Sequence, residues 1–255
     1  MPFTPASPET VSVFILIVLH VVAAFLAGVY YAYRAEPAVT WRMTLRAALG
    51  LAIWAGAVSA LVATGALASL PFSGLPVFFG SVFLVSIVTG CSRLAGRIAA
   101  EVPLMALVGF QAFRLPLELV LHRWALEGTV PNTMTWSGEN WDILSGIIAV
   151  MAAPFANRSR GIAWAANIIG SVLLLNVIRV AVLSSPLPFA WNVTPPLLLA
   201  FHLPYAMIGP ICVGGALVGH IVLTRALVRR RGGVETGDRI PETRKGKVSS
   251  KGHSI

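Results

Sequence analysis

Three ionisable residues follow one another at four-residue spacing inside an apolar stretch: Arg114, Glu118 and His122. Residues four apart lie on one face of an α-helix, so these side chains are predicted to form a stripe. Ionisable groups are costly in a bilayer, and where they occur they usually face a bundle interior and mark a functional site. A carboxylate and an imidazole near a guanidinium could bind a polar ligand or serve acid–base chemistry.

Further polar residues are expected at the same depth, because the predicted helices bring them to the outer half of the bundle. Pro116 interrupts the stripe and predicts a bend toward the bundle axis. Glu118 and His122 are the candidate acid and base. The predicted ligand-binding set comprises Gln111, Arg114, Glu118, His122, Asn140, Asp142, Asn176, Arg179 and His202.

The charges of this set favour an anionic ligand. Arg114 and Arg179 are permanently cationic, whereas Glu118 is the one carboxylate predicted in the membrane interior. We expect Arg179 to point inward and to meet Glu118 from the side opposite Arg114, beside a small polar cavity. The remaining positive charge would suit a carboxylate or phosphate. Alternatively, Arg114 pairs with Glu118 and Arg179 pairs with Asp142, and both pairs only tie helices together.

No metal or cofactor is expected. His20, His122 and His202 could join Glu118 as ligands, but no two of the four stand in a dedicated metal-binding spacing. The first 244 residues contain no lysine, which excludes a retinal Schiff base, and the chain has no phosphate-binding glycine loop. His220 is predicted to lie at the cytoplasmic end of the last span as an interface residue.

The composition defines a membrane protein. Of the 255 residues 56% are hydrophobic and 11% are charged, with a mean hydropathy of +0.80, whereas soluble domains carry about 25% charged residues. The net charge of +9 does not predict a nucleic-acid partner, because nine of the nineteen basic residues lie at or beyond Arg225. The two cysteines, Cys91 and Cys212, fall in or beside apolar runs and indicate no disulfide framework.

Apolar runs of about 17 to 25 residues predict membrane-spanning helices. The seven predicted spans cover residues 11–33, 45–70, 75–92, 102–124, 142–156, 161–183 and 197–224. Only helices or closed barrels satisfy the backbone in lipid, and runs this long are helical. The sequence therefore predicts an all-α fold, a seven-helix transmembrane bundle over residues 1–228, followed by a basic disordered tail over residues 229–255.

The distribution of arginine predicts the orientation. The first, third and fifth connections hold seven arginines in total, and the second, fourth and sixth hold Arg123 alone. Positive residues remain on the cytoplasmic side, so the N-terminus is expected outside and the C-terminal tail inside. Span 142–156 is short. If it did not cross the membrane, the arginines before it and those after it would predict opposite orientations of the chain.

Small residues predict close helix packing in two spans. Span 45–70 carries a small-residue ladder made of Ala52, Gly56, Ala60, Thr64 and Ala68. The last span carries Gly215 and Gly219 at GxxxG spacing. Contact inside one bundle is preferred to a homo-oligomer through these glycines, because seven helices offer many internal interfaces.

A set of motifs resembles an uncharacterised family of bacterial multi-pass membrane proteins. It begins with Phe113-Arg114-Leu115-Pro116-Leu117-Glu118 and continues through Glu127-Gly128, Asn140 and Asp142-Ile143. Asn167-Ile-Ile-Gly170 and Ser184-Ser-Pro-Leu-Pro188 are similar to the later part of that family. The resemblance covers roughly residues 105–225. It implies a seven-helix protein of the bacterial inner membrane and implies no activity.

Three functions remain open from the sequence. A binding or transport protein would hold a small anionic or polar ligand between the arginines. An intramembrane enzyme would use Glu118 or His122 as acid or base near Arg114, with the connection 127–141 closing over the substrate. A structural or assembly subunit would need no ligand. In each case the lipid bilayer is the expected partner.

Overall fold

The computed structural model describes residues 3–70 and 74–235, with side chains through Arg229. This part of the chain is helical and contains no β-strand. The α-helices are α1 (Pro8–Tyr33), α2 (Pro37–Ala63), α3 (Ala66–Ser69), α4 (Leu75–Cys91), α5 (Arg93–Glu101), α6 (Leu104–Gly109), α7 (Arg114–Leu126), α8 (Ile143–Ala156), α9 (Arg160–Ser184) and α10 (Gly214–Glu235). Short 3₁₀ or π segments are η2 (Phe110–Phe113), η3 (Asn132–Met134), η4 (Leu199–Phe201), η5 (Tyr205–Ile208) and η6 (Gly209–Val213).

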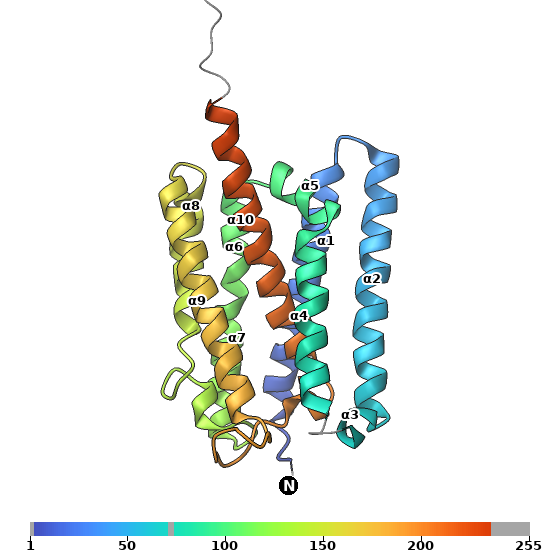
Figure 1. Cartoon of the computed structure of the whole chain (residues 1–255), viewed down its shortest axis with the longest axis vertical. Helices are drawn as coiled ribbons and strands as arrows, with labels where there is room; N and C mark the ends of the chain where they lie inside the picture. Colours follow the sequence, from blue (N-terminus) through green and yellow to red (C-terminus); the bar gives the residue numbers. More distant parts are fainter. Residues whose placement is uncertain (1–2, 71–73, 236–255) are drawn as a thin grey trace, which may run out of the picture.

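Helix length and hydropathy confirm a multi-pass membrane protein. Within the described ranges, five helical stretches are long and apolar enough to span a bilayer: Pro8–Tyr33, Pro37–Ala63, Leu104–Leu126, Arg160–Ser184 and Tyr205–Arg229. A sixth candidate is the pair α4 and α5, which bends by 57° at Ser92. α8 is apolar but has 14 residues. It packs beside α9 in the same bundle (Figure 1).

The stretch Leu104–Leu126 changes its helical type just before the predicted break. η2 gives one 3₁₀ turn between α6 and α7, and Pro116 follows in the first turn of α7. Proline has no N–H to donate to the carbonyl four residues earlier, which favours a tighter preceding turn. Gln111 therefore lies within the 3₁₀ turn, and Arg114 is the first residue of α7.

The last predicted span begins too early in the sequence-based assignment. Residues 197–204 are not a continuous helix; they form the 3₁₀ turn η4 and irregular backbone, and the apolar helix begins at Tyr205. Pro204 and Pro210 lack the N–H groups that a regular helix needs there. The span therefore starts with η5 and the π-helical η6 before α10 becomes regular.

The second predicted span also differs at its start and in its packing. α2 begins at Pro37, a favourable first helical residue, so Arg42 lies inside the helix rather than in the connection. The helix ends at Ala63 and not at residue 70, so Thr64 is its C-cap and Ala68 lies in α3. All five residues of the small-residue ladder, including Gly56, are exposed. The expected internal packing of that ladder is therefore wrong. Gly215 and Gly219 instead lie inside the bundle, against Val21 and Gln111 respectively.

α10 continues past the predicted boundary at residue 228, as far as Glu235. The remainder of the predicted disordered tail, residues 236–255, lies outside the described residues.

The connections are gathered at two opposite ends of the bundle (Figure 1). The N-terminus lies at one end with the connections 127–142 and 185–204. The connections 34–36 and 157–159 lie at the other end, together with α5. The second end is the arginine-rich one. Consecutive long helices therefore run in alternating directions.

Aromatic packing ties the first helix to the middle of the chain. The ring of Trp124 lies 5.2 Å from that of Phe14 and 5.0 Å from that of Tyr205, both in edge-to-face geometry. All three side chains are buried. Trp124 also donates its indole N–H to Thr10 at 3.0 Å. These contacts fix α1 against α7 and η5 next to the end where the polar residues gather.

Candidate functional site: a buried polar chain beside a cavity

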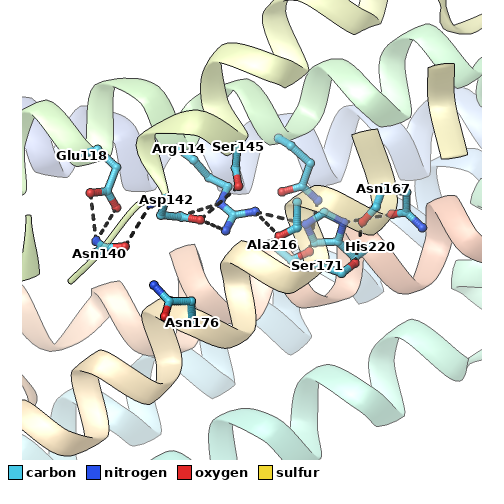
Figure 2. Close-up of polar contacts among 12 residues, drawn as sticks. Arg114, Glu118, Asn140, Asp142, Ser145, Asn167, Ser171, Asn176, Ala216 and His220 are labelled. Carbon is cyan, nitrogen blue, oxygen red and sulfur yellow. Dashed lines mark hydrogen bonds and ion pairs between the residues drawn. The ribbon is translucent and has the colours of Figure 1, made fainter. Parts of the chain in front are cut away.

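Arg114 and Asp142 form a buried two-pronged ion pair in the centre of the polar residues (Figure 2). Nε donates to Oδ2 at 2.6 Å, and Nη2 donates to Oδ1 in a close contact. Arg114 is 1% exposed and Asp142 is 4% exposed. Ser145, one turn into α8, donates its hydroxyl to the same carboxylate at 3.1 Å. Two charges in this environment are stabilised by their mutual pairing and by these further hydrogen bonds.

The other side of the guanidinium joins α9 and α10. Nη1 donates to the carbonyl of Gly170 at 3.1 Å and lies 3.1 Å from Nε2 of His220. A guanidinium can only donate, so Nε2 of His220 accepts. Four of the five N–H groups of Arg114 are thereby used, and the fifth, on Nη2, has no partner in the described part of the chain.

The hydrogen bonds beyond His220 assign its tautomer. Asn167 donates its amide N–H to the hydroxyl of Thr224 at 2.7 Å, and that hydroxyl donates to the carbonyl of His220 at 2.8 Å. The amide oxygen of Asn167 is therefore the acceptor for Nδ1 of His220 at 2.9 Å. The imidazole is neutral, with its proton on Nδ1. Polar contacts thus run without a gap from Asp142 to Asn167 (Figure 2), and the hydrogen bond from Asn167 extends them to Thr224.

Glu118 lies at the opposite end of this chain and has a different environment. Nδ2 of Asn140 is 3.0 Å from Oε1 and 2.9 Å from Oε2 of Glu118. Asn140 is itself oriented by two backbone groups: it donates to the carbonyl of Met134 and accepts from the N–H of Asp142, both at 3.1 Å. No basic side chain lies within ion-pair distance of Glu118 among the described residues. Its carboxyl group is 1% exposed.

A cavity of about 80 Å³ lies beside these groups. Its charged lining comes from Arg114, Glu118 and Asp142, with Ser185 as a further polar residue. The other walls are mainly apolar side chains of α4, α7, α9, the connection 185–204 and the η6–α10 segment. A cavity of the expected kind is therefore present and contacts both Arg114 and Glu118, although Arg179 does not line it. It is less polar than expected. Apolar walls with a few convergent polar groups are the usual lining of small-molecule sites, but this volume is below the about 300–1,000 Å³ of drug-sized sites and suits a ligand of only a few heavy atoms.

Two glycines allow the helices to approach closely enough for this geometry. A Cβ atom on Gly146 would lie 2.4 Å from the backbone nitrogen of Leu115, so α8 rests directly on the backbone of α7. A Cβ atom on Gly170 would lie 2.7 Å from the His220 ring. A larger residue at either position would separate the helices that carry the polar chain.

Arg179 does not take its predicted place. Its side chain is half exposed, lies 3.6 Å from the Glu139 carboxylate and is 5.5 Å above the Trp191 ring. Asn176 accepts from Arg179 at 3.0 Å and donates to the backbone carbonyl of Glu139 at 2.8 Å. The predicted triad of Arg114, Glu118 and Arg179 is wrong, as are the alternative pairs Arg114 with Glu118 and Arg179 with Asp142. Arg179 has solvent-exposed partners that involve no desolvation cost.

The two other predicted histidines lie apart from the cavity. His122 stacks on Trp136, with ring centroids 4.1 Å apart, and its Nδ1 has no hydrogen-bond partner among the described residues. His202 stacks on Phe3 at 3.9 Å. Burial lowers the pKa of His202 below its ordinary value. Neither residue is hydrogen-bonded to Glu118.

Gln111 belongs to the buried polar group but faces α10. Its Nε2 donates to the carbonyl of Ala216 at 3.1 Å, and its Oε1 is buried without a partner in the described part of the chain. Sequence reasoning missed His220, Asn167 and Ser145 as members of this network. The available signal was that each is a polar residue inside an otherwise apolar helix.

Within residues 3–70 and 74–235, no three His, Cys, Asp or Glu side chains gather in a metal-binding arrangement. Comparisons with protein-family models, with curated proteins and with solved structures found no match. The fold and the buried residues therefore define the class alone: an all-helical, multi-pass membrane protein with a charged network in its interior.

Proposed function

We propose that this protein binds a small molecule with an apolar body and one polar, hydrogen-bond-donating end in the cavity beside Glu118. The observation that carries the proposal is a buried carboxyl group that lines a cavity and has Asn140 as its polar partner. Both carboxyl oxygens share one amide nitrogen, so they retain acceptor capacity. Burying such capacity without a partner is costly, and a bound ligand would relieve that cost.

The charges favour a neutral or cationic ligand end over an anionic one. Arg114 is neutralised by Asp142, and four of its N–H groups are already used. Glu118 adds a further acidic group to the cavity wall. A bound anion would therefore face the Glu118 carboxyl group, and no guanidinium would be free to bind the anion through two N–H groups. A hydroxyl or amine could donate to Glu118, and a hydroxyl oxygen could also accept from the remaining N–H of Arg114.

Different parts of the network support different roles. The groups from Arg114 through His220 to Thr224 are hydrogen-bonded to one another, apart from one N–H of Arg114, and join α7, α8, α9 and α10, as a structural role requires. Glu118 is the part with unused capacity. The enzymatic alternative, with Glu118 and His122 as acid and base, receives less support because His122 stacks on Trp136 instead.

The test uses three probes with the same four-carbon chain: 1-butanol, butylamine and butyrate. Thermal unfolding of the purified protein in detergent is measured with each probe. We expect the alcohol and the amine to raise the melting temperature and butyrate to leave it unchanged. Glu118→Leu should abolish the response, because it removes the acceptor. Leu119→Ala, at an exposed position on the same helix, is the matched control and should respond like the wild type.

A second readout uses Cys212, which lines the cavity. In a Cys91→Ser background it is the one remaining thiol. The alcohol and the amine should slow its alkylation by N-ethylmaleimide, and butyrate should not. Equal responses to all three probes, or an unchanged response in Glu118→Leu, would contradict the proposal.

The topology that accompanies this function is the predicted one: seven spans in a bacterial inner membrane, with the N-terminus outside and the C-terminus in the cytoplasm. The gathering of the arginine-rich connections at one end of the bundle supports it. A reporter that is active only in the cytoplasm should give signal when fused at Ile255 and none when fused near Asn132. The reverse pattern would place the cavity toward the cytoplasmic leaflet.

A further inference from the structure

A second and larger cavity lies on the opposite face of the η6–α10 segment. It has a volume of about 550 Å³ and is bordered by α1, α2, α4, α6 and α10. This volume is within the range of about 300–1,000 Å³ that small-molecule sites occupy. Small residues create the space on three sides, among them Gly28 on α1, Gly109 at the end of α6 and Gly215 on α10.

The walls of this cavity suit a hydrocarbon chain. Its lining is almost entirely aliphatic or aromatic, and His20 is its one histidine. It contains no Asp, Glu, Lys or Arg side chain. In a membrane protein such a space is reached from lipid and not from water, and an apolar occupant removes no polar group from solvent.

The length and position of the cavity match one leaflet. On α1 its lining runs from His20 to Tyr31, which is about 16 Å along a helix that rises about 1.5 Å per residue. The hydrocarbon core of a bilayer is about 30 Å thick, so the cavity covers about half of it. It reaches from the middle of the bundle to the arginine-rich end, where α1 ends at Tyr33.

Positive charge is available where the cavity approaches that end. The Arg34 guanidinium lies 3.8 Å above the ring of Tyr31, which is itself a lining residue. Arg97 is paired with Glu36 and Glu101, but Arg34 has no carboxylate within ion-pair distance among the described residues. Arg42 and Arg93 lie exposed near the same end. Such a cluster attracts anionic headgroups.

We infer that this cavity holds one acyl chain of an anionic phospholipid from the leaflet at the arginine-rich end, with its headgroup phosphate beside Arg34. The chain occupies the space between α1, α6 and α10. Arg34 donates from Nη1 to the backbone carbonyl of Tyr31 at 2.7 Å, and the phosphate supplies the negative charge that no carboxylate of the described residues brings to its guanidinium. The bound lipid would fill a volume that is otherwise large for a helical interior. This site is separate from the cavity at Glu118 and does not depend on the function proposed for it.

The test uses phosphatidylglycerol and phosphatidylcholine with identical acyl chains that carry a photoactivatable diazirine at mid-chain. The full-length protein is reconstituted in nanodiscs with each lipid, irradiated, and the adducts are mapped by mass spectrometry. Phosphatidylglycerol should label Val218 and Ala106, which line the cavity, severalfold more than phosphatidylcholine does. Both lipids should label the exposed Leu84 and Ile53 equally.

Two substitutions separate the chain from the headgroup. A Cβ atom on Gly28 has its nearest neighbour at 4.0 Å, so Gly28→Leu should fill the cavity without displacing backbone and should suppress the Val218 and Ala106 adducts. Gly56→Leu has equal free space but faces outward, and it should leave labelling unchanged. Arg34→Gln should reduce phosphatidylglycerol labelling to the phosphatidylcholine level.

Either of two results would overturn the inference. The first is that the lipid adducts of the wild-type protein are confined to outward-facing residues, because that result would show that no acyl chain enters the cavity. The second is equal cavity labelling by the two lipids, which would remove the headgroup contact. Both comparisons use the wild-type protein and hold even if Gly28→Leu does not fold.

Discussion

Nε of Arg114, the first residue of α7, lies 2.6 Å from Oδ2 of Asp142, the N-cap residue of α8, although the two are separated by 28 positions. The pair joins the first turn of α7 to the start of α8 at a point that solvent does not reach. Because each charge is neutralised by the other, the pair is predicted to matter most when one partner alone is removed.

Asp142→Asn should therefore destabilise the protein by about 3–5 kcal/mol, because it leaves a buried guanidinium without its counter-charge. The double variant Arg114→Leu with Asp142→Leu should lose less than the single variant, because neither charge remains. Thermal or denaturant unfolding in detergent measures both effects. A double variant that is no more stable than the single one would indicate that the contacts of Arg114 to α9 and α10 outweigh the pair.

His220 is predicted to act as a neutral connector between Arg114 and Asn167. His220→Leu removes the acceptor of an Arg114 N–H and the donor to the Asn167 amide oxygen. Each buried polar group left without a partner lowers the stability of the fold by about 1–3 kcal/mol. Thr224→Val affects only the end of the network and should cost less. Nitrogen-15 NMR of labelled histidine should show the Nδ1–H tautomer for His220, and the Nε2–H form would contradict the assigned hydrogen bonds.

The contact between α7 and α8 predicts a strong difference between two glycine substitutions. Gly146→Ala should destabilise the protein by about 1–3 kcal/mol, because the new methyl group meets the backbone of Leu115 and forces the helices apart. Gly80→Ala on α4 has no atom within 4 Å of the added Cβ. It should be neutral or stabilising by up to about 1 kcal/mol, because alanine is the better helix former. Unfolding midpoints of the two variants provide the comparison.

Acid should loosen the attachment of the N-terminal segment to the end of α7. Burial opposes the ionisation of Glu127. The N–H and the hydroxyl of Ser7 donate to its carboxylate at 2.9 Å and 3.0 Å, and the Arg123 guanidinium lies beside it. These contacts outweigh burial, so the pKa of Glu127 lies below its ordinary value of 4.5. The folded state thus binds its proton at lower pH than the unfolded state. Stability from this carboxylate is complete above pH 4.5 and is lost as pH falls through the lowered pKa.

Glu127→Gln provides the control for that prediction. The wild type should be more stable than the variant near neutral pH, and the difference should vanish in acid. Unfolding measured from neutral pH to pH values below 4.5 tests it. A difference that is constant over this range would mean that the hydrogen bonds, and not the charge of Glu127, hold the segment.

The sequence was sufficient to predict that Arg114 and Glu118 turn inward, because ionisable groups in apolar helices avoid lipid, and that the connection after α7 brings Asn140 and Asp142 to the same side of the bundle. It was not sufficient to predict how they pair. The four-residue spacing suggested Arg114 with Glu118, but the choice of Asp142 depends on how closely α8 approaches α7. That approach is set by Gly146, whose role becomes visible only when the two backbones are placed against each other.

The same limitation applies to His220. A last span that begins at residue 197 places His220 near its cytoplasmic end. Because the apolar helix in fact begins at Tyr205 and continues to Arg229, His220 lies nearer its middle and reaches Arg114. The prolines before residue 211 shift the start of the helix, and hydropathy alone does not detect such a shift.

The η6–α10 segment forms a wall of both cavities: Cys212 and Ala216 face the one beside Glu118, whereas Ile211 and Gly215 face the larger apolar one. A ligand that widens one cavity by displacing the η6–α10 segment narrows the other cavity. Thermodynamic reciprocity then requires that each occupant alter the affinity of the second by the same factor. The π-helical turn from Gly209 to Val213 is the part of this shared wall where regular α-helical hydrogen bonding is interrupted.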